Sequence, residues 1–300
     1  MPPARRAAAG LSYALAAYLT WGLVPVYFRA LAGVPPLEIL AHRIAWSVPI
    51  LWLLVQGLGR WAEVRRPLAS PRSLLLVAAT TALIGLNWLV YIWAVDQGRV
   101  LEASLGYFVN PLVNVLLGVL FLREPLTRRQ VAAVALASAG VLALVLRAGR
   151  LPWISLVLAL SFGTYGLLRK RARLDAVAGL LVETGLLAPL ALVYLWRLHA
   201  AGTGHLGASP RLTVLLVASG LVTSFPLIWF AKGVERLRLS TVGLVQYVAP
   251  SMQFAIAVFL FREPFGAAHA VAFACIWTAL ALYAGEAIAL ARRVERPASR

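Results

Sequence analysis

Long apolar runs separated by short polar segments repeat along the whole chain. A helix that spans a bilayer needs about 20 consecutive, predominantly apolar residues. Ten stretches fit this requirement, at 11–31, 36–56, 73–95, 101–122, 127–146, 152–169, 176–197, 211–231, 239–261 and 267–290. The pattern therefore predicts an all-α membrane protein with ten transmembrane helices.

The composition indicates that lipid is the solvent for most of the surface. Hydrophobic residues make up 61% of the chain and charged residues 13%, and a soluble domain of this size cannot hide so large an apolar share in its core. The loops are short, and the sequence contains no phosphate-binding loop, zinc-ligand spacing or nucleophile–base pair. The single cysteine, Cys275, lies in an apolar run. We therefore expect no enzyme activity, no metal and no cofactor.

The formal net charge of +17 depends on Lys and Arg residues that lie between the apolar runs. Twenty of them fall in one set of alternating polar segments and seven in the other. Because cytoplasmic loops carry the excess of positive charge, we expect both termini in the cytoplasm, as short tails at 1–10 and 291–300. Clusters of Lys and Arg that are separated by apolar runs indicate membrane topology rather than a nucleic-acid-binding surface.

An internal repeat covers nearly the whole chain. A shift of 139 positions aligns the tripeptide Arg-Glu-Pro at 123–125 with the same tripeptide at 262–264. The two repeats, at 11–146 and 152–290, each contain five predicted spans. Because five is an odd number, the second repeat crosses the membrane in the opposite direction to the first. Inverted repeats of this kind are a recurring architecture of secondary transporters.

Several segments carry a resemblance to a known family. They are Ala41–Ser47, Tyr107–Pro111, Ser161–Lys170 and the two Arg-Glu-Pro tripeptides. Together with the repeat, they resemble the RarD group of the EamA family, within the drug/metabolite transporter superfamily. The resemblance implies a ten-helix permease of the bacterial inner membrane with both termini inside, in a group whose name is linked to chloramphenicol sensitivity. It identifies no substrate.

Two ionisable residues stand out inside the predicted spans, where a charge is costly and usually faces a cavity or a partner. Arg43 lies in the second span and Glu183 in the seventh, at the same position of the repeat. We interpret Arg43 as a substrate-binding residue for an anionic or carbonyl-bearing group, and Glu183 as the candidate for proton coupling. The alternative is that each residue only snorkels or bonds a nearby carbonyl and so holds helices together. Whether the two side chains contact each other stays open.

Polar stripes around a central proline mark the fourth and ninth predicted spans. The stripe on the fourth span consists of Tyr107, Asn110, Pro111 and Asn114. The stripe on the ninth consists of Gln246, Pro250 and Gln253. Residues at this spacing share one helix face, and proline bends a helix and frees a carbonyl. We interpret the polar residues as a substrate-binding cavity lining and Pro111 and Pro250 as hinges; the alternative is hydrogen bonding between helices alone.

Four further positions are predicted to line the same cavity. They are Asn87, Tyr91, Ser161 and Tyr165. Aromatic rings can stack on a flat or cationic cargo, while amide and hydroxyl groups orient its polar atoms. Trp and Tyr also gather at membrane interfaces because their rings are amphipathic, and aromatic residues near span ends fit that alternative.

These features lead to one working hypothesis. The chain is a multi-pass permease of the bacterial cytoplasmic membrane that moves a small metabolite or drug-like molecule by gradient-driven alternating access, with export favoured. Uptake or exchange of a small metabolite is the first alternative, and a non-transporting membrane scaffold or sensor is the second. The expected partners are a small-molecule substrate and the lipid bilayer, and not nucleic acid. The cargo, the coupling ion and the oligomeric state stay open.

Overall fold

The computed structural model describes residues 3–122, 127–148, 151–172, 175–234, 236–237 and 245–294. Within these ranges the regular structure is helical, without a strand. The long helices are α1 (Pro3–Arg29), α2 (Pro36–Leu58), α4 (Pro71–Asp96), α5 (Val100–Leu122), α6 (Arg128–Ala148), α7 (Trp153–Ala172), α8 (Ala176–Ala200), α9 (Pro210–Val234) and α12 (Ala267–Val294). The short ones are α3 (Trp61–Arg65), the 3₁₀ segment η1 (Arg66–Leu68), α11 (Val248–Ala255) and the π segment η2 (Ile256–Leu260).

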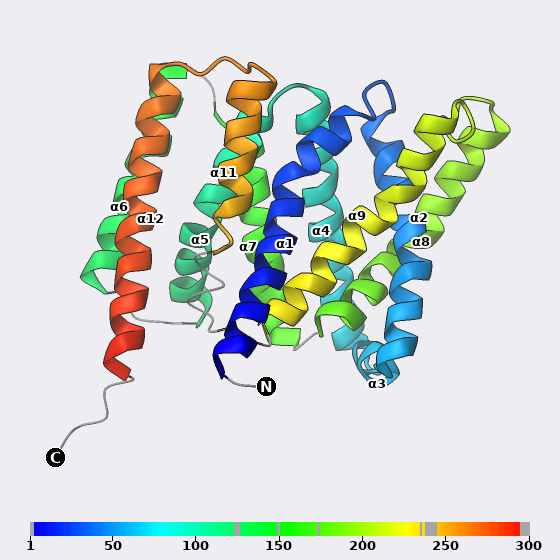
Figure 1. Ribbon diagram of the computed structural model, residues 1–300, viewed down its shortest axis with the longest axis horizontal. Coiled ribbons are helices and arrows are strands. Elements are labelled where there is room, and N and C mark those ends of the chain that lie inside the picture. Colours follow the sequence, from blue (N-terminus) through cyan, green and yellow to red (C-terminus); the bar gives the residue numbers. More distant parts are fainter. Residues whose placement is uncertain are drawn as a thin grey trace.

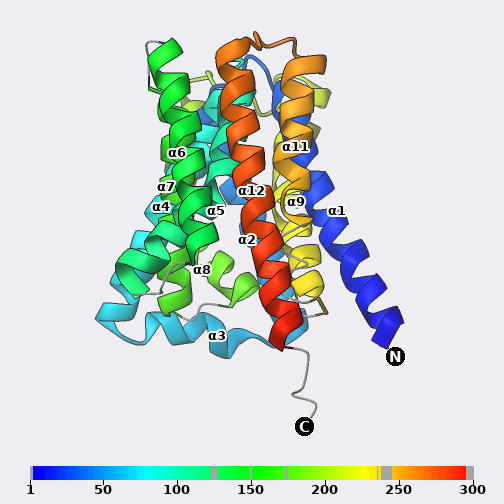
Figure 2. The ribbon, with the colours of Figure 1, turned by 90° about the vertical axis from the view of Figure 1, so that its left-hand side faces the viewer.

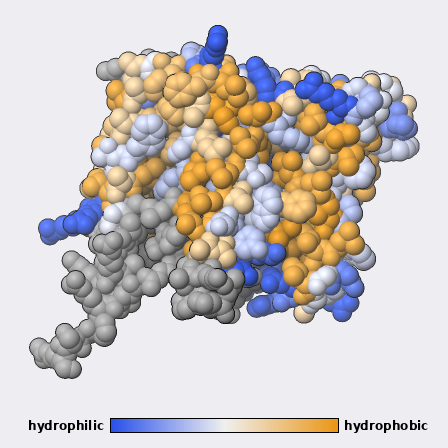
Figure 3. Space-filling view, in the orientation of Figure 1, coloured by the Kyte–Doolittle hydropathy of each residue, from blue (hydrophilic) through white to orange (hydrophobic). Residues whose placement is uncertain are grey.

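Six of the described helices are long and apolar enough to cross a membrane, namely α1, α2, α4, α5, α8 and α9. Shorter apolar stretches of 10–17 residues lie in α6, in α7, in α11 with η2, and in α12. Apolar residues cover much of the middle of the face shown in Figure 3, and hydrophilic residues gather towards its ends. The prediction of an all-helical chain with several membrane-crossing helices is confirmed for the described residues, while the count of ten spans stays a prediction.

Local sequence features explain where several helices begin and end. The helices α2, α4 and α9 each begin with a proline, whose fixed φ suits the first turn and whose missing N–H is not needed there. The hydroxyl of Ser70 accepts a hydrogen bond of 3.2 Å from the backbone N–H of Ser73 and so caps α4. Gly59 ends α2 with a φ of +65°, a conformation that glycine adopts without strain.

The segment that follows η2 contacts the start of α5 through Glu263. The carboxylate of Glu263 accepts hydrogen bonds of 2.7 Å from the backbone N–H groups of both Val100 and Leu101, so it caps the first turn of α5. Burial raises the pKa of the Glu263 carboxyl above its ordinary value. The second Arg-Glu-Pro tripeptide is thus a structural junction, while the first, at 123–125, lies outside the described residues. The predicted start of the ninth span, at 239–244, lies outside them as well.

The long helices pack side by side in one bundle (Figures 1 and 2). The helix α2 packs against α8 and α9, α1 against α9 and α11, α4 against α7 and α8, and α5 against α7 and α11. The helices α6 and α12 pair with each other at one edge of the bundle. The start of α1, the end of α12 and the short helix α3 lie at the same end of the molecule (Figure 1). Residues far apart in sequence therefore meet between α1, α2, α4 and α9.

Candidate functional site

Arg43 lies in α2, and side chains from three other helices contact it. Its Nε donates a hydrogen bond of 2.6 Å to Oγ1 of Thr223 on α9. The central carbon of its guanidinium lies 4.2 Å from the ring centre of Trp88 on α4 and 6.0 Å from that of Phe28 on α1. Attraction between a cation and an aromatic face adds to the hydrogen bond. These contacts hold the guanidinium of Arg43 where α1, α2, α4 and α9 meet.

No carboxylate of the described residues balances the charge of Arg43. The ion pairs within 4 Å that these residues form all involve other basic groups, and the hydrogen bond from Nε leaves the Nη groups without a described acceptor. A cation taken out of water without a counter-ion is costly. The side chain is only partly buried. A guanidinium that lies between helices without a described carboxylate, and that stays partly exposed, is typical of a site that takes an acceptor group from a ligand.

Three tyrosines lie close enough to Arg43 to interact with its charge, namely Tyr27, Tyr91 and Tyr107. The rings of Tyr91 and Tyr107 lie 5.6 Å apart in an edge-to-face arrangement. The hydroxyl of Tyr91 is buried and has no hydrogen-bond partner among the described groups, although buried hydroxyls normally have one. A hydroxyl without a described partner, beside a guanidinium without a described counter-ion, gives a bound anion or carbonyl two different donors.

Asn87 ties the group around Arg43 to α5 and α7. Its amide nitrogen donates to the carbonyl of Leu158, at 3.1 Å, and to the hydroxyl of Ser161, at 2.9 Å. Its amide oxygen accepts a hydrogen bond of 3.3 Å from the hydroxyl of Tyr107. The amide is thus largely satisfied inside the protein. The structure brings together Asn87, Tyr91, Tyr107 and Ser161, and Asn87 orients Tyr107 beside Arg43.

Glu183 forms a second polar cluster, between α7 and α8. Its side chain is fully buried, and Oε2 accepts hydrogen bonds from the hydroxyl of Tyr165, at 3.0 Å, and from Nη1 of Arg169, at 3.2 Å. Arg169 Nη1 also donates to the Tyr165 hydroxyl, at 2.5 Å. The partner of Glu183 is therefore Arg169 and not Arg43. Tyr165, predicted to bind substrate, belongs to this cluster.

The Glu183 cluster continues to the end of the bundle through Asp175. Arg169 Nη2 donates to the backbone carbonyl of Asp175, at 2.5 Å. The Asp175 carboxylate accepts from Arg60 Nη1, also at 2.5 Å, and caps the first turn of α8. A chain of charged contacts thus links the end of α2 to the start of α8 and the last turn of α7.

Asn110 and Gln253 are buried, and each has a side-chain oxygen without a partner among the described groups. The amide nitrogen of Gln253 donates to the carbonyl of Trp21, at 3.1 Å, so it joins α11 to α1. The other two amides lie differently. Asn114 is exposed beside Gly163 of α7, and Gln246 is partly buried in the turn before α11.

The two prolines predicted as hinges occupy different places. Pro111 lies within α5, and Pro250 lies in the first turn of α11, where a proline leaves no hydrogen bond unmade. A hinge role for either residue stays a prediction.

Residues 8–146 match the EamA-like transporter family. Over 98% of this chain and 99% of its own length, the protein RarD of Escherichia coli (strain K12) is 44% identical to the chain. The chain belongs to the RarD group of the EamA family. It is a multi-pass bacterial membrane transporter and not an enzyme. The resemblance carried by the sequence segments is thereby confirmed.

Other relatives of this RarD-group transporter span comparable lengths. The uncharacterized transporter YojE of Bacillus subtilis (strain 168) is 43% identical over 91% of this chain and 93% of its own length. The chloramphenicol-sensitive protein RarD of Pseudomonas aeruginosa is 35% identical over 96% of this chain and 97% of its own. A protein of known crystal structure, 20% identical, matches 92% of this chain and 96% of its own with a TM-score of 0.59. That last likeness concerns the fold alone.

Sequence reasoning on this RarD-group transporter missed several partners of the predicted residues. Phe28 and Thr223 contact Arg43, and Arg169 contacts Glu183. Ser219 and Thr223 lie four residues apart in an apolar run, and this helical spacing was the available signal for a polar face on α9. Arg169 is one of the basic residues whose distribution predicts the topology, and it lies at the end of the predicted span 152–169.

The contact between Arg43 and Thr223 depends on a close crossing of α2 and α9. A Cβ atom built at Gly220, one turn before Thr223, would lie 2.5 Å from the carbonyl carbon and 2.6 Å from the carbonyl oxygen of Trp46. Backbone atoms cannot swing aside, so the substitution Gly220→Ala is expected to separate the helices. Overpacking of this kind destabilises by about 1–3 kcal/mol. We expect a melting temperature several degrees lower in detergent solution.

The matched control for this prediction is Gly166→Ala on α7. A Cβ atom built at Gly166 meets no heavy atom within 4 Å, and alanine favours helix more than glycine does. The control is therefore expected to melt at the wild-type temperature or above it. Equal melting temperatures for Gly220→Ala and Gly166→Ala would contradict the close crossing.

Proposed function

We propose that this transporter is a secondary-active permease that exports a small anionic or carbonyl-bearing molecule by alternating access, with Arg43 as the anchor for that group. The observation that carries the proposal is a guanidinium inside the bundle with no carboxylate within 4 Å among the described residues. Thr223 and Trp88 orient it, and Tyr91 supplies a second free donor. Removal of a polar molecule from water becomes favourable when each of its acceptors meets such a donor.

Alternating access requires two similar arrangements of the bundle, which an inverted repeat supplies. We propose that α1, α2, α4, α5 and α6 form one half and that α7, α8, α9, α11 and α12 form the other. The pattern of helix pairs supports this division. An exchange of each helix for its counterpart turns the pair α1–α9 into α7–α4 and the pair α5–α7 into α11–α1, and all four pairs occur in the bundle. The excess of Lys and Arg at the loops on the α3 side supports termini in the cytoplasm.

We further propose that Glu183 couples transport to protons. A carboxylate that is fully buried and held by one arginine and one tyrosine loses its ion pair when it is protonated. Arg169 also holds the carbonyl of Asp175 at the start of α8, so the protonation state of Glu183 bears on how α7 and α8 are joined. Its location on the α7–α8 pair, separate from Arg43, leaves the substrate group free to bind in either protonation state.

Ligand discovery and counterflow together test the proposed function. Purified protein is heated with a library of small carboxylates, phosphates and carbonyl compounds, with chloramphenicol included because one relative is named as sensitive to it. A ligand of the native state raises the melting temperature, by mass action. We expect a hit that also shows counterflow in proteoliposomes, faster from the cytoplasmic face if export is the physiological direction.

Two outcomes separate the alternatives. Faster net flux from the external face would favour uptake, and equal counterflow from both faces without net flux would favour exchange. A library that yields neither a stabilising ligand nor counterflow would favour the non-transporting scaffold or sensor and would overturn the proposal.

A further inference from the structure

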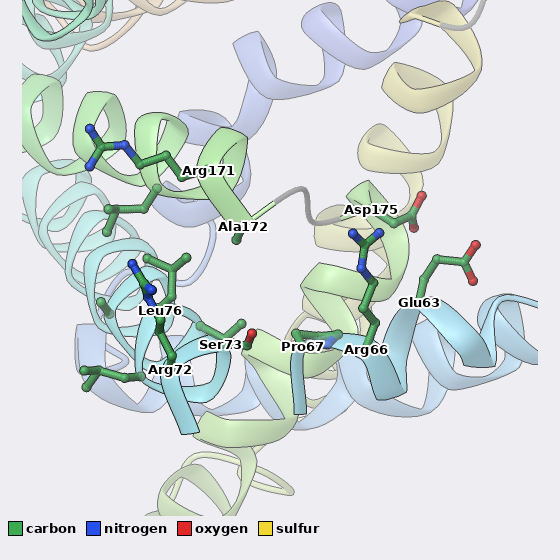
Figure 4. A pocket seen from close by; sticks show the side chains of 13 residues that line it. Glu63, Arg66, Pro67, Arg72, Ser73, Leu76, Arg171, Ala172 and Asp175 are labelled. Carbon is green, nitrogen blue, oxygen red and sulfur yellow. The ribbon is translucent and has the colours of Figure 1, made fainter. Parts of the chain in front are cut away.

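A pocket of about 1090 Å³, lined in part by Asp175 of the Glu183 cluster, lies where the start of α4 faces the end of α7 (Figure 4). Its polar lining includes Arg72 and Ser73 from the first turn of α4 and Arg171 from the last turn of α7. Its apolar lining includes Leu75 from α4 and Leu168 from α7. These residues lie at the same end of the bundle as α3, so the pocket sits at the boundary between the apolar spans and water.

The charges in this pocket are distributed unevenly. Figure 4 shows Arg72 and Arg171 on one side of the opening, and Arg66 with Glu63 and Asp175 on the other. No carboxylate of the described residues lies within 4 Å of Arg72 or Arg171. The side of Arg72 and Arg171 therefore carries two positive charges without a counter-ion among the described residues.

The two arginines also have donors to spare. Arg171 uses one N–H group on the carbonyl of Phe121, at 3.2 Å, and a guanidinium carries five. The nearby start of α4 adds the partial positive charge of a helix N-terminus, of which Ser70 satisfies only one N–H group by its side chain. Guanidinium groups match the oxygens of a phosphate in charge and geometry.

The apolar lining of the pocket favours a lipid over a soluble anion. Leu75 lies in a membrane-spanning helix and has an exposed fraction of 73%. This side of the pocket therefore opens to the bilayer. A free phosphate gains nothing from an aliphatic wall, whereas a phospholipid places an acyl chain along it. Basic pockets between transmembrane helices on the cytoplasmic side are suited to anionic head groups.

We propose that this pocket binds an anionic phospholipid, with its phosphate between Arg72 and Arg171 and the first part of an acyl chain along Leu75 and Leu168. The site is independent of the group around Arg43. Given the proposed topology, the lipid comes from the cytoplasmic leaflet.

Native mass spectrometry of the full chain in detergent tests the proposal. The probes are phosphatidylglycerol, phosphatidylcholine and soluble glycerol 3-phosphate at matched concentrations. Wild-type protein is expected to keep one more phosphatidylglycerol than phosphatidylcholine, and glycerol 3-phosphate is expected not to displace it. The variant Arg72→Gln/Arg171→Gln is expected to lose that lipid, with an affinity lower by about fivefold for each arginine.

The matched control is Arg65→Gln/Arg129→Gln, which removes two exposed arginines that do not line the pocket and is expected to keep the lipid. The single variant Arg72→Gln changes one exposed side chain and keeps the test decisive if the double variant fails to fold. Equal retention of phosphatidylglycerol by wild type and Arg72→Gln would overturn the proposal. Equal retention of phosphatidylcholine, or displacement by glycerol 3-phosphate, would overturn it as well.

Discussion

Replacement of Arg43 by alanine is expected to weaken ligand binding by about 100-fold and to reduce transport to the background level. The loss of one member of a buried, hydrogen-bonded charge pair reduces affinity by about 2–5 kcal/mol, and each 1.4 kcal/mol is about a factor of ten. In the bound state the ligand would be the missing partner of this guanidinium, since no described carboxylate fills that place. The melting-temperature shift that the ligand produces measures the change.

The same substitution is expected to leave the ligand-free protein as stable as the wild type, or more stable. Alanine removes a poorly balanced charge together with its desolvation penalty, while the lost contacts to Thr223 and Trp88 act in the opposite direction. A residue that only held helices together would behave differently, because its loss would lower the melting temperature of the free protein. The stability of the free protein therefore separates a ligand anchor from a structural residue.

Two further variants sharpen this test. Arg43→Lys keeps the charge but loses the planar group that binds two acceptor oxygens at once, so we expect intermediate binding. Arg197→Ala removes an exposed arginine near the end of α8 and is expected to bind and transport like the wild type. Unimpaired binding and transport by Arg43→Ala would rule out the anchor role.

The fold of this chain could be predicted at the level of its helices because the bilayer allows few solutions. Backbone groups in lipid must be satisfied within the protein, so a run of about 20 apolar residues becomes a helix. The predicted span 36–56 and the helix α2 (Pro36–Leu58) illustrate this agreement. A soluble domain offers no comparable constraint, since its helices depend on tertiary packing.

The partners of the polar residues could not be predicted in the same way. The repeat predicts that Arg43 and Glu183 lie at equivalent positions, each the same number of residues into its span from opposite sides of the membrane. The rotation of a helix about its axis, however, depends on which neighbours pack against it. Close contact between Gly220 and Trp46 brings α9, with Thr223, to Arg43, and Arg169 follows Tyr165 by one turn and reaches Glu183. Depth follows from counting residues, whereas direction requires the packing of the whole bundle.

The stripe on α5 shows the same limit within one helix. Asn110 and Asn114 are one turn apart and share a face, as the spacing predicted. Asn110 is nevertheless buried, whereas Asn114 is exposed beside Gly163. Helical spacing predicts that residues point the same way and does not predict what covers them.

Glu183→Gln is expected to abolish flux driven by a pH gradient while counterflow of the same ligand continues. Glutamine has the shape of a protonated glutamate and cannot release a proton, so the coupled step stops. Arg43 and its direct contacts Thr223 and Trp88 lie on helices other than α7 and α8, so ligand binding at Arg43 is expected to stay within about twofold of the wild type. Proteoliposomes loaded at one pH and diluted into another measure the driven flux, and counterflow at equal pH measures exchange.

Stability measurements check the physical basis of this prediction. Loss of the carboxylate leaves Arg169 beside Tyr165 without its anionic partner, and disruption of a buried ion pair destabilises by about 3–5 kcal/mol, less here because Arg169 keeps its hydrogen bond to the carbonyl of Asp175. The double variant Glu183→Gln/Arg169→Gln removes the orphaned charge and is expected to recover part of the melting temperature. Flux through the double variant is still expected to be uncoupled.

The combination of the two measurements assigns a role to Glu183 that neither gives alone. If Glu183 were only structural, Glu183→Gln would lower stability, driven flux and counterflow in proportion, and the double variant would restore stability and flux together. If Glu183 couples transport to protons, Glu183→Gln removes the driven flux and keeps the counterflow. No second substitution restores the driven flux, because the titratable group itself is absent. Full pH-driven flux in Glu183→Gln would remove this carboxylate from the coupling mechanism, and the proton, if one is used, would then have to bind elsewhere in the bundle.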